Sequence, residues 1–179
     1  MGTHGGAVRW RDPLFGTNPI GIGLPTEPVI DFDFATSKRT WGEVRVAAAL
    51  GTDVPKEAFL KKDGSFATKP DEAYSAVPFG GYKGSAICLL VEILTGALVG
   101  IAKDAVGDYR TTLRGAVVIA IDASVFTSGF GAAVSSLLED VRKEARVPGE
   151  RSEKKRKELV EKGEVEVDEG IWKEIEEIS

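Results

Sequence analysis

Residues 77–84 read Val-Pro-Phe-Gly-Gly-Tyr-Lys-Gly, and residues 85–102 continue as Ser-Ala-Ile-Cys-Leu-Leu-Val-Glu-Ile-Leu-Thr-Gly-Ala-Leu-Val-Gly-Ile-Ala. The three glycines and one proline of the first stretch stop any regular element there. The apolar run that follows predicts a long helix over residues 85–102. A glycine-rich loop therefore brings the chain to the N-terminus of that helix.

The same apolar run is long enough to suggest a membrane span. However, Glu92 lies in its middle, and Gly96 and Gly100 interrupt it. Charged residues are costly inside a bilayer. A buried helix of a soluble protein is therefore the preferred prediction, and no membrane partner is expected.

Strands and helices are predicted on both sides of this helix. Residues 20–24 and 29–34 are apolar, β-branched or aromatic runs separated by a Pro-Thr-Glu-Pro turn, a pattern typical of paired strands. The continuously apolar residues 115–122 predict a buried strand, and helical spacing of apolar or charged residues predicts helices over residues 40–50, 132–146, 151–162 and 169–178. Because strands and helices do not alternate regularly, the expected class is α+β. We expect one domain over residues 1–146 and a C-terminal helical segment over residues 147–179.

Composition excludes several classes of function. The 179 residues are 42% hydrophobic and 28% charged with a net charge of -5, the balance of a soluble globular protein without the basic surface that nucleic-acid binding needs. The single cysteine, Cys88, lies in the apolar run, which fits core packing in a reducing compartment. Residues 1–10 lack the apolar core of a secretory signal. A cytoplasmic location and no nucleic-acid partner are therefore expected.

The usual catalytic constellations are missing from the sequence. His4 is the only histidine, so no Cys-His pair and no cluster of histidines and cysteines with metal-ligand spacing exists. The chain also has no Gly-x-Ser-x-Gly elbow, no Gly-x-Gly-x-x-Gly and no Walker-type loop. His4 is interpreted as a surface residue, with a weak alternative as a base. No catalytic residue and no metal site are predicted.

The loop before the apolar helix has the chemistry of an anion site. Gly80, Gly81, Lys83 and Gly84 lie where free backbone N–H groups, the positive end of a helix dipole and a lysine converge. The alternative is a glycine-rich turn with a solvated lysine. The residues by themselves leave both interpretations open.

Two further clusters could contact a ligand. Residues 33–38, Asp-Phe-Ala-Thr-Ser-Lys, follow a predicted strand with short side chains that let a ligand approach the backbone, or they form a plain turn with a Ser or Thr N-cap. Residues 147–151, Val-Pro-Gly-Glu-Arg, separate two predicted helices. Arg151 would suit a phosphate or carboxylate there, unless the segment is only a helix–helix linker.

Five motifs in order resemble the successive signatures of the type-2 malate/L-lactate/ureidoglycolate dehydrogenase family. They are Gly-Thr-Asn-Pro-Ile at residues 16–20, Asp-x-Ala-Thr-Ser at 33–37, Pro-Phe-Gly-Gly-Tyr-Lys-Gly at 78–84, Leu-Thr-Gly at 94–96 and Pro-Gly-Glu-Arg at 148–151. The resemblance extends over essentially the whole chain. Five motifs in the family's order and approximate spacing are more specific than any one of them. The chain resembles the C-terminal, cofactor-binding portion of such an enzyme.

This resemblance implies a fold, an activity and a set of site residues. The implied fold is a mostly antiparallel sheet flanked by helices, unrelated to the Rossmann fold, in a homodimer. The implied activity is NAD- or NADP-dependent interconversion of 2-keto acids, or related cyclic imines, with reduced forms such as malate or lactate. A residue near the cofactor would fall at Thr3, and a substrate-carboxylate arginine at Arg110 or Arg114. The implied cofactor-binding residues are Thr17, Asn18, Asp33, Ala35, Thr36, Ser37, Lys83, Gly84, Gly149, Glu150 and Arg151.

The chain also departs from the family. The family's catalytic histidine and its substrate-binding serine and arginine belong to an N-terminal segment that would precede Met1, and Glu43 stands where lysine is common. Two hypotheses follow. The chain is the cofactor-binding portion of an oxidoreductase, with the histidine supplied by a separate N-terminal chain if one exists. Alternatively, it is a truncated, non-catalytic remnant that serves as a dimerisation or binding module.

Overall fold

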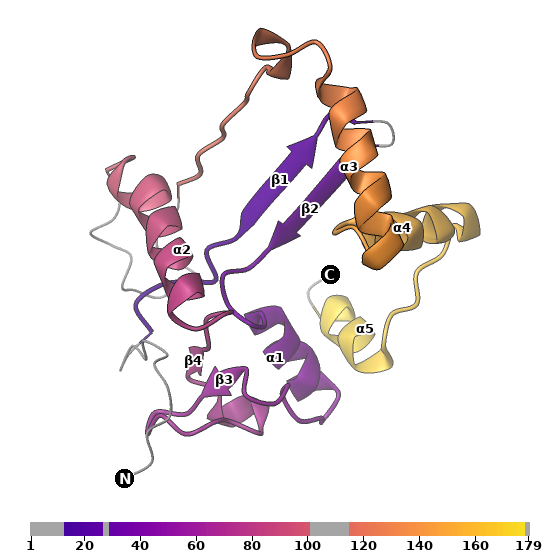
Figure 1. Cartoon of the computed structure of the whole chain (residues 1–179). Coiled ribbons are helices and arrows are strands. Elements are labelled where there is room, and N and C mark those ends of the chain that lie inside the picture. Colours follow the sequence, from indigo (N-terminus) through magenta and orange to yellow (C-terminus); the bar gives the residue numbers. More distant parts are fainter. Residues whose placement is uncertain (1–12, 27–28, 101–114, 178–179) are drawn as a thin grey trace. The chain divides into compact units, whose positions relative to one another are not determined.

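The computed structural model describes residues 13–26, 29–100 and 115–177, which form two compact units (Figure 1). Unit 1 takes in the described parts of Met1–Ile20, Ala35–Val117 and Val167–Ser179. Unit 2 takes in those of Gly21–Phe34 and Val118–Glu166. The division of the chain at residue 147 stays a prediction.

Unit 1 is built around a small apolar core. Helix α1 (Trp41–Ala49) contributes Val44 and Ala47, which lie three residues apart on one helix face. Strands β3 (Phe59–Leu60) and β4 (Ser75–Ala76) pair antiparallel, with the 3-10 turn η1 (Pro70–Glu72) between them. The Phe59 side chain is fully buried and its ring centroid lies 5.5 Å from that of Trp41. The residues of the core are Val44, Ala47, Val54, Ala58, Phe59 and Ala67.

The last helix, α5 (Glu169–Glu176), belongs to unit 1 and contacts α1. Its N-cap is Asp168, whose carboxylate accepts a hydrogen bond of 2.8 Å from the Gly170 amide. A Cβ at Gly170 would lie 3.3 Å from the Ala49 carbonyl oxygen. The glycine therefore lets the two helices approach closely, and the predicted capped helix over residues 169–178 is confirmed within Glu169–Glu176.

The long apolar helix differs from its prediction. Helix α2 (Tyr82–Glu92) begins three residues before the predicted start and passes into one π turn, η2 (Ile93–Ala97). Its outer face is not buried, because Leu89, Leu90 and Ile93 are 41%, 53% and 48% exposed. Within residues 13–26, 29–100 and 115–177, no helix is long and apolar enough to cross a membrane.

The predicted strand over residues 115–122 is wrong for the described chain. Residues 115–122 belong to no helix or strand. Gly115 packs so tightly against the Thr95 carbonyl and the Val99 side chain that a Cβ there would collide with both. Val118 and Ile119, beyond it, are 90% and 74% exposed. The apolar sequence has the composition of a central strand, but the described chain offers it no partner to complete a ladder.

Unit 2 contains one two-stranded sheet and two helices. Strands β1 (Ile20–Leu24) and β2 (Ile30–Phe34) run antiparallel (Figure 1), as predicted for residues 20–24 and 29–34. After the 3-10 turn η4 (Ala123–Val125) come α3 (Phe130–Glu144) and α4 (Glu150–Lys162), both confirming predicted helices. Helix α4 ends at Gly163, whose φ of 71° is the left-handed conformation that glycine adopts without strain.

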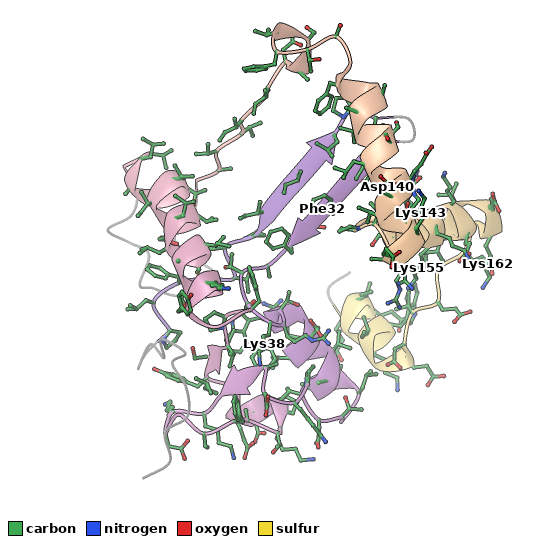
Figure 2. All side chains as sticks on the ribbon, in the orientation of Figure 1. Phe32, Lys38, Asp140, Lys143, Lys155 and Lys162 are labelled. Atoms are coloured by element: carbon green, nitrogen blue, oxygen red, sulfur yellow. The ribbon has the colours of Figure 1, made fainter. Side chains whose placement is uncertain are left out.

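Charged side chains lie along α4 and on the C-terminal part of α3, where Figure 2 labels Asp140 and Lys143. Lys143 bonds Asp140 one turn earlier on α3 at 2.6 Å, and on α4 Glu153 pairs with Arg156 and Lys157. These exposed pairs add little stability singly. The fold is thus a mixed α and β structure with two separate antiparallel two-stranded sheets, and the larger sheet flanked by helices is not formed by the described residues.

Glu72 anchors the β3–β4 region of unit 1. Its carboxylate accepts hydrogen bonds from Lys61 Nζ at 2.6 Å and from the Thr68 and Lys69 amides at 3.0 and 3.2 Å. These donors favour the ionised form. They lower the pKa of Glu72 to about 2, chiefly through Lys61.

Glu72→Gln is therefore expected to lower the stability of unit 1 in a pH-dependent way. Because the folded pKa is depressed, the contribution is fully present above the unfolded value near 4.5 and is lost as the pH falls toward 2. Urea unfolding measures the free energy of unfolding of wild type and variant at pH 7 and between pH 4.5 and 2. The difference between the two proteins should shrink across this window. Asp71→Asn, on the exposed neighbouring carboxylate, should show no such trend. A difference in unfolding free energy between wild type and Glu72→Gln that is constant with pH contradicts the prediction.

Candidate functional site

The buried residue Thr36 joins three of the motif loops in unit 1. Its side chain is 1% exposed. Both its amide and its hydroxyl donate to the Thr17 carbonyl at 2.8 Å, and its own carbonyl accepts from the Phe79 amide at 3.1 Å. The Lys38 amide adds a bond of 2.7 Å to the Val77 carbonyl. These hydrogen bonds therefore hold three loops against one another, at residues 16–18, 35–38 and 77–79.

Asn18 fastens the first of these loops to helix α2. Its Nδ2 donates to the Cys88 carbonyl at 3.0 Å and to Glu92 Oε2 at 2.9 Å. Its φ of 38° is in the left-handed region, where asparagine is one of the few non-glycine residues found. The pairing gives Glu92 a polar partner inside its apolar run. Sequence reasoning did not find this contact, although a lone carboxylate in an apolar helix was the signal.

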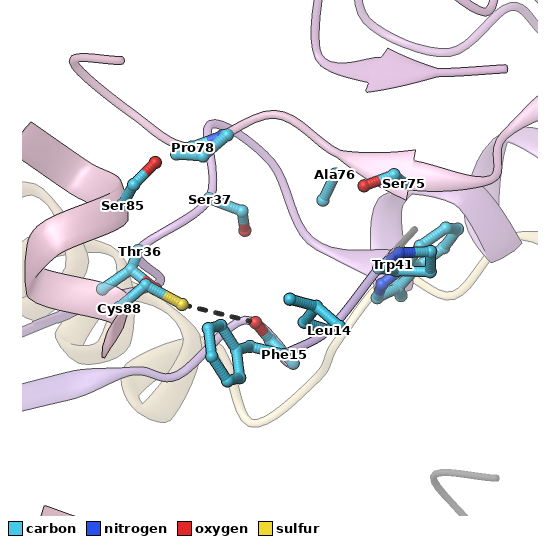
Figure 3. A pocket seen from close by; sticks show the side chains of 12 residues that line it. Leu14, Phe15, Thr36, Ser37, Trp41, Ser75, Ala76, Pro78, Ser85 and Cys88 are labelled. Atoms are coloured by element: carbon cyan, nitrogen blue, oxygen red, sulfur yellow. Dashed lines mark hydrogen bonds between the residues drawn. The ribbon is translucent and has the colours of Figure 1, made fainter. Parts of the chain in front are cut away.

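A small pocket lies beside this junction (Figure 3). Its volume is about 50 Å³, and Phe15, Thr36, Ser37, Ser85 and Cys88 are among its lining residues. Burial raises the pKa of the Cys88 thiol, so it stays neutral, and its Sγ lies 4.0 Å from the Gly16 carbonyl oxygen. The cavity admits a few waters at most, whereas sites for drug-sized ligands measure roughly 300–1,000 Å³.

The start of α2 opens onto solvent beside the junction. Gly80 and Gly81 have φ of 56° and 64°, and nothing lies within 4 Å of a Cβ built on Gly81. The amides of Tyr82, Lys83 and Gly84 precede the first intrahelical bond and have no intrahelical acceptor. Lys83 is exposed, while Gly84 is buried against the Phe79 carbonyl with no room for a Cβ. The amides of the exposed residues Tyr82 and Lys83 and the Lys83 ammonium group thus provide an open surface for an anion.

In unit 2, the loop before α4 packs against strand β2. Gly149 has φ 89°, and a Cβ there would collide with the Asp31 carbonyl oxygen. Glu150, the first residue of α4, pairs with Arg142 of α3 at 2.7 Å. Arg151 and the β2 residue Asp33 are exposed. The structure therefore brings residues 148–150 to the strand that carries Asp33, and the Glu150 carboxylate is already paired.

A hollow of about 410 Å³ lies between this loop and α4. Its size suits a small ligand. Eight charged residues line it. They are the acidic residues Asp31, Glu150, Glu153, Glu158 and Glu161 and the basic residues Arg142, Lys154 and Lys157. With five carboxylates and three cations, the hollow does not favour a phosphate.

Several predicted residues cannot be placed. Arg110 and Arg114, the predicted substrate ligands, lie outside the described residues, as do Thr3 and His4. Among the residues that the structure does describe, no group of three or more His, Cys, Asp or Glu side chains could hold a metal ion. The roles of the other predicted residues in cofactor binding stay predictions.

Comparison with known proteins assigns the family. Residues 6–176 match the model of the family described as malate/L-lactate dehydrogenase. The chain belongs to this family. It is 34% identical over 152 residues, 78% of the chain, to the L-sulfolactate dehydrogenase of Methanothermobacter thermautotrophicus. It is 32% identical over 180 residues, 93% of the chain, to the malate/(S)-sulfolactate dehydrogenase of Methanothermus fervidus.

The structural likeness agrees with the sequence match. The crystal structure of delta1-piperideine-2-carboxylate reductase from Pseudomonas syringae matches 91% of this chain with a TM-score of 0.73 and 30% identity. The alignments cover 45% and 53% of the two archaeal proteins and 53% of the bacterial one. This member of the malate/L-lactate dehydrogenase family therefore spans about half the length of the relatives that it matches.

The contact between Gly149 and Asp31 predicts a position-specific effect of alanine in unit 2. Gly149→Ala is expected to destabilise the unit for two reasons: its backbone φ is positive, and the new Cβ would collide with the β2 backbone. Gly163→Ala is the control, because Gly163 also has a positive φ, of 71°, but has open space around it. This control should show only the cost of the positive φ, about 1 kcal/mol. Amide exchange of residues 30–34 should accelerate in Gly149→Ala alone. Equal exchange in the two variants would contradict the close approach.

Proposed function

We propose that this chain is the cofactor-binding portion of an NAD(P)-dependent oxidoreductase acting on a 2-keto/2-hydroxy acid or a related cyclic imine. The observation that carries the proposal is the family match over residues 6–176. The bound nicotinamide would supply or accept the hydride. The contribution of the chain's own residues is to bind and orient that cofactor.

The open start of α2 fits the phosphates of a dinucleotide. The amides of the exposed residues Tyr82 and Lys83, the Lys83 ammonium and the clear space over Gly81 suit an anion that approaches the backbone closely. The 50 Å³ pocket beside it is too small for a nicotinamide ring with its ribose. In this proposal the phosphates are held at the surface of unit 1.

The remaining predicted residues divide between direct and supporting roles. Thr36 and Asn18 already use their side-chain donors within unit 1, so we assign them to positioning the loops. Lys83 and Gly84 would contact phosphate. Further contacts are proposed for Thr17, Asp33, Ala35, Ser37, Gly149, Glu150 and Arg151, and Arg110 or Arg114 would bind the substrate carboxylate.

The substrate class is inferred from the relatives. The names of the compared proteins refer to sulfolactate, malate and piperideine-2-carboxylate. Each is a carboxylate whose neighbouring carbon bears an oxygen or nitrogen, and this carbon is the atom that is oxidised or reduced. The same class is proposed here, with NAD and NADP both open, in a cytoplasmic homodimer.

The second candidate is a non-catalytic binding or dimerisation module. The observation that favours it is an exposed apolar surface in unit 1. The exposed apolar residues Leu89 and Leu90 on α2 and Ile93 at the start of η2 are a surface that such a module could use. Cofactor affinity discriminates between the two candidates, because only the first requires it.

Lys83→Ala is expected to weaken NAD(P)H binding by roughly tenfold to a hundredfold. A charge-assisted hydrogen bond contributes about 1.5–3 kcal/mol, which corresponds to this change in Kd. Calorimetry or cofactor fluorescence on the purified chain measures it. Lys56→Ala, on an exposed lysine of the same unit, is the control and should bind like wild type. Equal binding by both variants refutes the phosphate role of Lys83, and no binding by wild type refutes cofactor binding by this chain.

The chain by itself is expected to show negligible NAD(P)H-dependent reduction of oxaloacetate, pyruvate or piperideine-2-carboxylate. Its single histidine is His4, and the family's proton donor is expected in the part that this sequence does not contain. Absorbance at the nicotinamide band with each substrate measures turnover. Robust turnover would require a different proton donor and would overturn this expectation.

A further inference from the structure

Glu92 is a half-buried carboxylate in the apolar part of helix α2, between Val91 and Ile93. In the part of the chain that the structure describes, its side chain has one hydrogen-bond partner, the Asn18 amide at 2.9 Å, and no lysine or arginine pairs with it. A partly buried carboxylate without a cation does not by itself stabilise a helix of apolar residues. The reason for a carboxylate at this position is therefore sought in Asn18.

Asn18 has a backbone conformation that its surroundings must maintain. Its φ of 38° is in the left-handed region, which residues with a side chain rarely adopt. Pro19 follows, and a residue before proline prefers an extended conformation. Asn18 Nδ2 is fixed by two acceptors on α2, the Cys88 carbonyl at 3.0 Å and Glu92 Oε2. Backbone strain of this kind persists where neighbouring contacts impose it, and it is concentrated at ligand-binding and catalytic sites.

The conformation of Asn18 affects the loop before α2 through Thr36. The Thr17 carbonyl, in the peptide bond to Asn18, accepts hydrogen bonds from the Thr36 amide and hydroxyl, both at 2.8 Å. The Thr36 carbonyl accepts from the Phe79 amide at 3.1 Å. Gly84, in the first turn of α2, packs against the Phe79 carbonyl. These contacts form a closed circuit that leaves α2 in its last turn and returns to its first turn.

We propose that Glu92 is a positioning residue that acts through Asn18 and Thr36 to hold residues 79–84 in the conformation that binds the phosphates of NAD(P)H. Glu92 follows Lys83 by nine residues, about 13 Å along the helix axis. It therefore acts on the phosphates through the loop and not by direct contact. The inference rests on the proposed function of the chain in cofactor binding. It also gives a reason for the carboxylate in an otherwise apolar stretch.

Two substitutions of Glu92 separate positioning from charge. Glu92→Gln keeps an acceptor for Asn18, whereas Glu92→Leu removes it, and both remove the negative charge. Loss of a negative charge alone would leave the binding of an anion unchanged or strengthen it. We expect Glu92→Gln to bind NAD(P)H at least as tightly as wild type. Glu92→Leu should raise Kd roughly threefold to tenfold, the effect of one ordinary hydrogen bond, and calorimetry measures both values.

A double-mutant cycle tests whether Glu92 acts through Asn18. Asn18→Ala removes the next member of the circuit, so Glu92→Leu should have no further effect on Kd in that background. Thermal unfolding tests the alternative of a merely structural role, because leucine suits the apolar helix and the melting temperature of Glu92→Leu should not fall below that of wild type. Glu92→Ala, which adds no volume, should weaken binding to the same extent.

Amide hydrogen exchange tests the circuit without a cofactor. The Thr36 and Phe79 amides donate the hydrogen bonds that join the loops. Both should exchange at least tenfold faster in Glu92→Leu than in wild type or Glu92→Gln. The control is the Ala67 amide, which donates to the Phe59 carbonyl in the core of the same unit and should exchange at one rate in all three proteins.

The outcomes distinguish this inference from the proposed function. If wild type binds NAD(P)H, the inference is overturned by an unchanged Kd of Glu92→Leu, by an equal loss in Glu92→Gln, by additive effects with Asn18→Ala, or by unchanged exchange of the Thr36 and Phe79 amides. If wild type binds no NAD(P)H, the proposed function fails and the phosphate role of Glu92 fails with it, whatever the exchange rates are.

Discussion

The loops of unit 1 depend on the hydrogen bonds of one buried threonine. Thr36 donates twice to the Thr17 carbonyl and accepts from the Phe79 amide. A polar side chain that is 1% exposed is costly unless it is bonded. Its partners come from loops 19 and 43 residues away in sequence, so the second residue after strand β2 fixes both the loop at residues 16–18 and the approach to helix α2.

The same bonds explain why the motifs could be found from sequence, whereas the separate roles of their residues in ligand contact and in holding the loops could not. Short polar residues after a strand predict either a ligand contact or a turn. In the structure, the Thr36 hydroxyl and both Asn18 amide hydrogens are used within the protein, whereas Lys83 remains exposed at the start of α2. This distinction depends on contacts between segments that lie tens of residues apart, which local patterns do not contain.

The fold was predictable where its determinants are local. The apolar runs on both sides of a short turn predicted the strands β1 and β2. Gly163 predicted the end of α4, and Asp168 predicted the start of α5. Prediction failed at residues 115–122, where composition indicates a strand but pairing decides whether one forms. It also missed the π turn at Ile93–Ala97, where the Thr95 hydroxyl donates to the Val91 carbonyl and Gly115 packs against the Thr95 carbonyl.

The contrast between the two units has one physical cause. In unit 1, α1 and the β3–β4 pair lie within 36 residues of sequence and enclose Phe59 among residues of their own neighbourhood. In unit 2, the strands precede the helices by about 100 residues and only Ile30 and Val147 are buried. A core made from local segments needs few contacts over long sequence distances, whereas a core between the strands and the helices of unit 2 would need many, and a two-stranded sheet alone is only marginally stable. Exposed apolar residues of unit 2 therefore lie on its strands, such as Ile22 and Phe34, and also on its helices, such as Leu137 and Val160. Unit 1 holds the loops that we propose for cofactor binding.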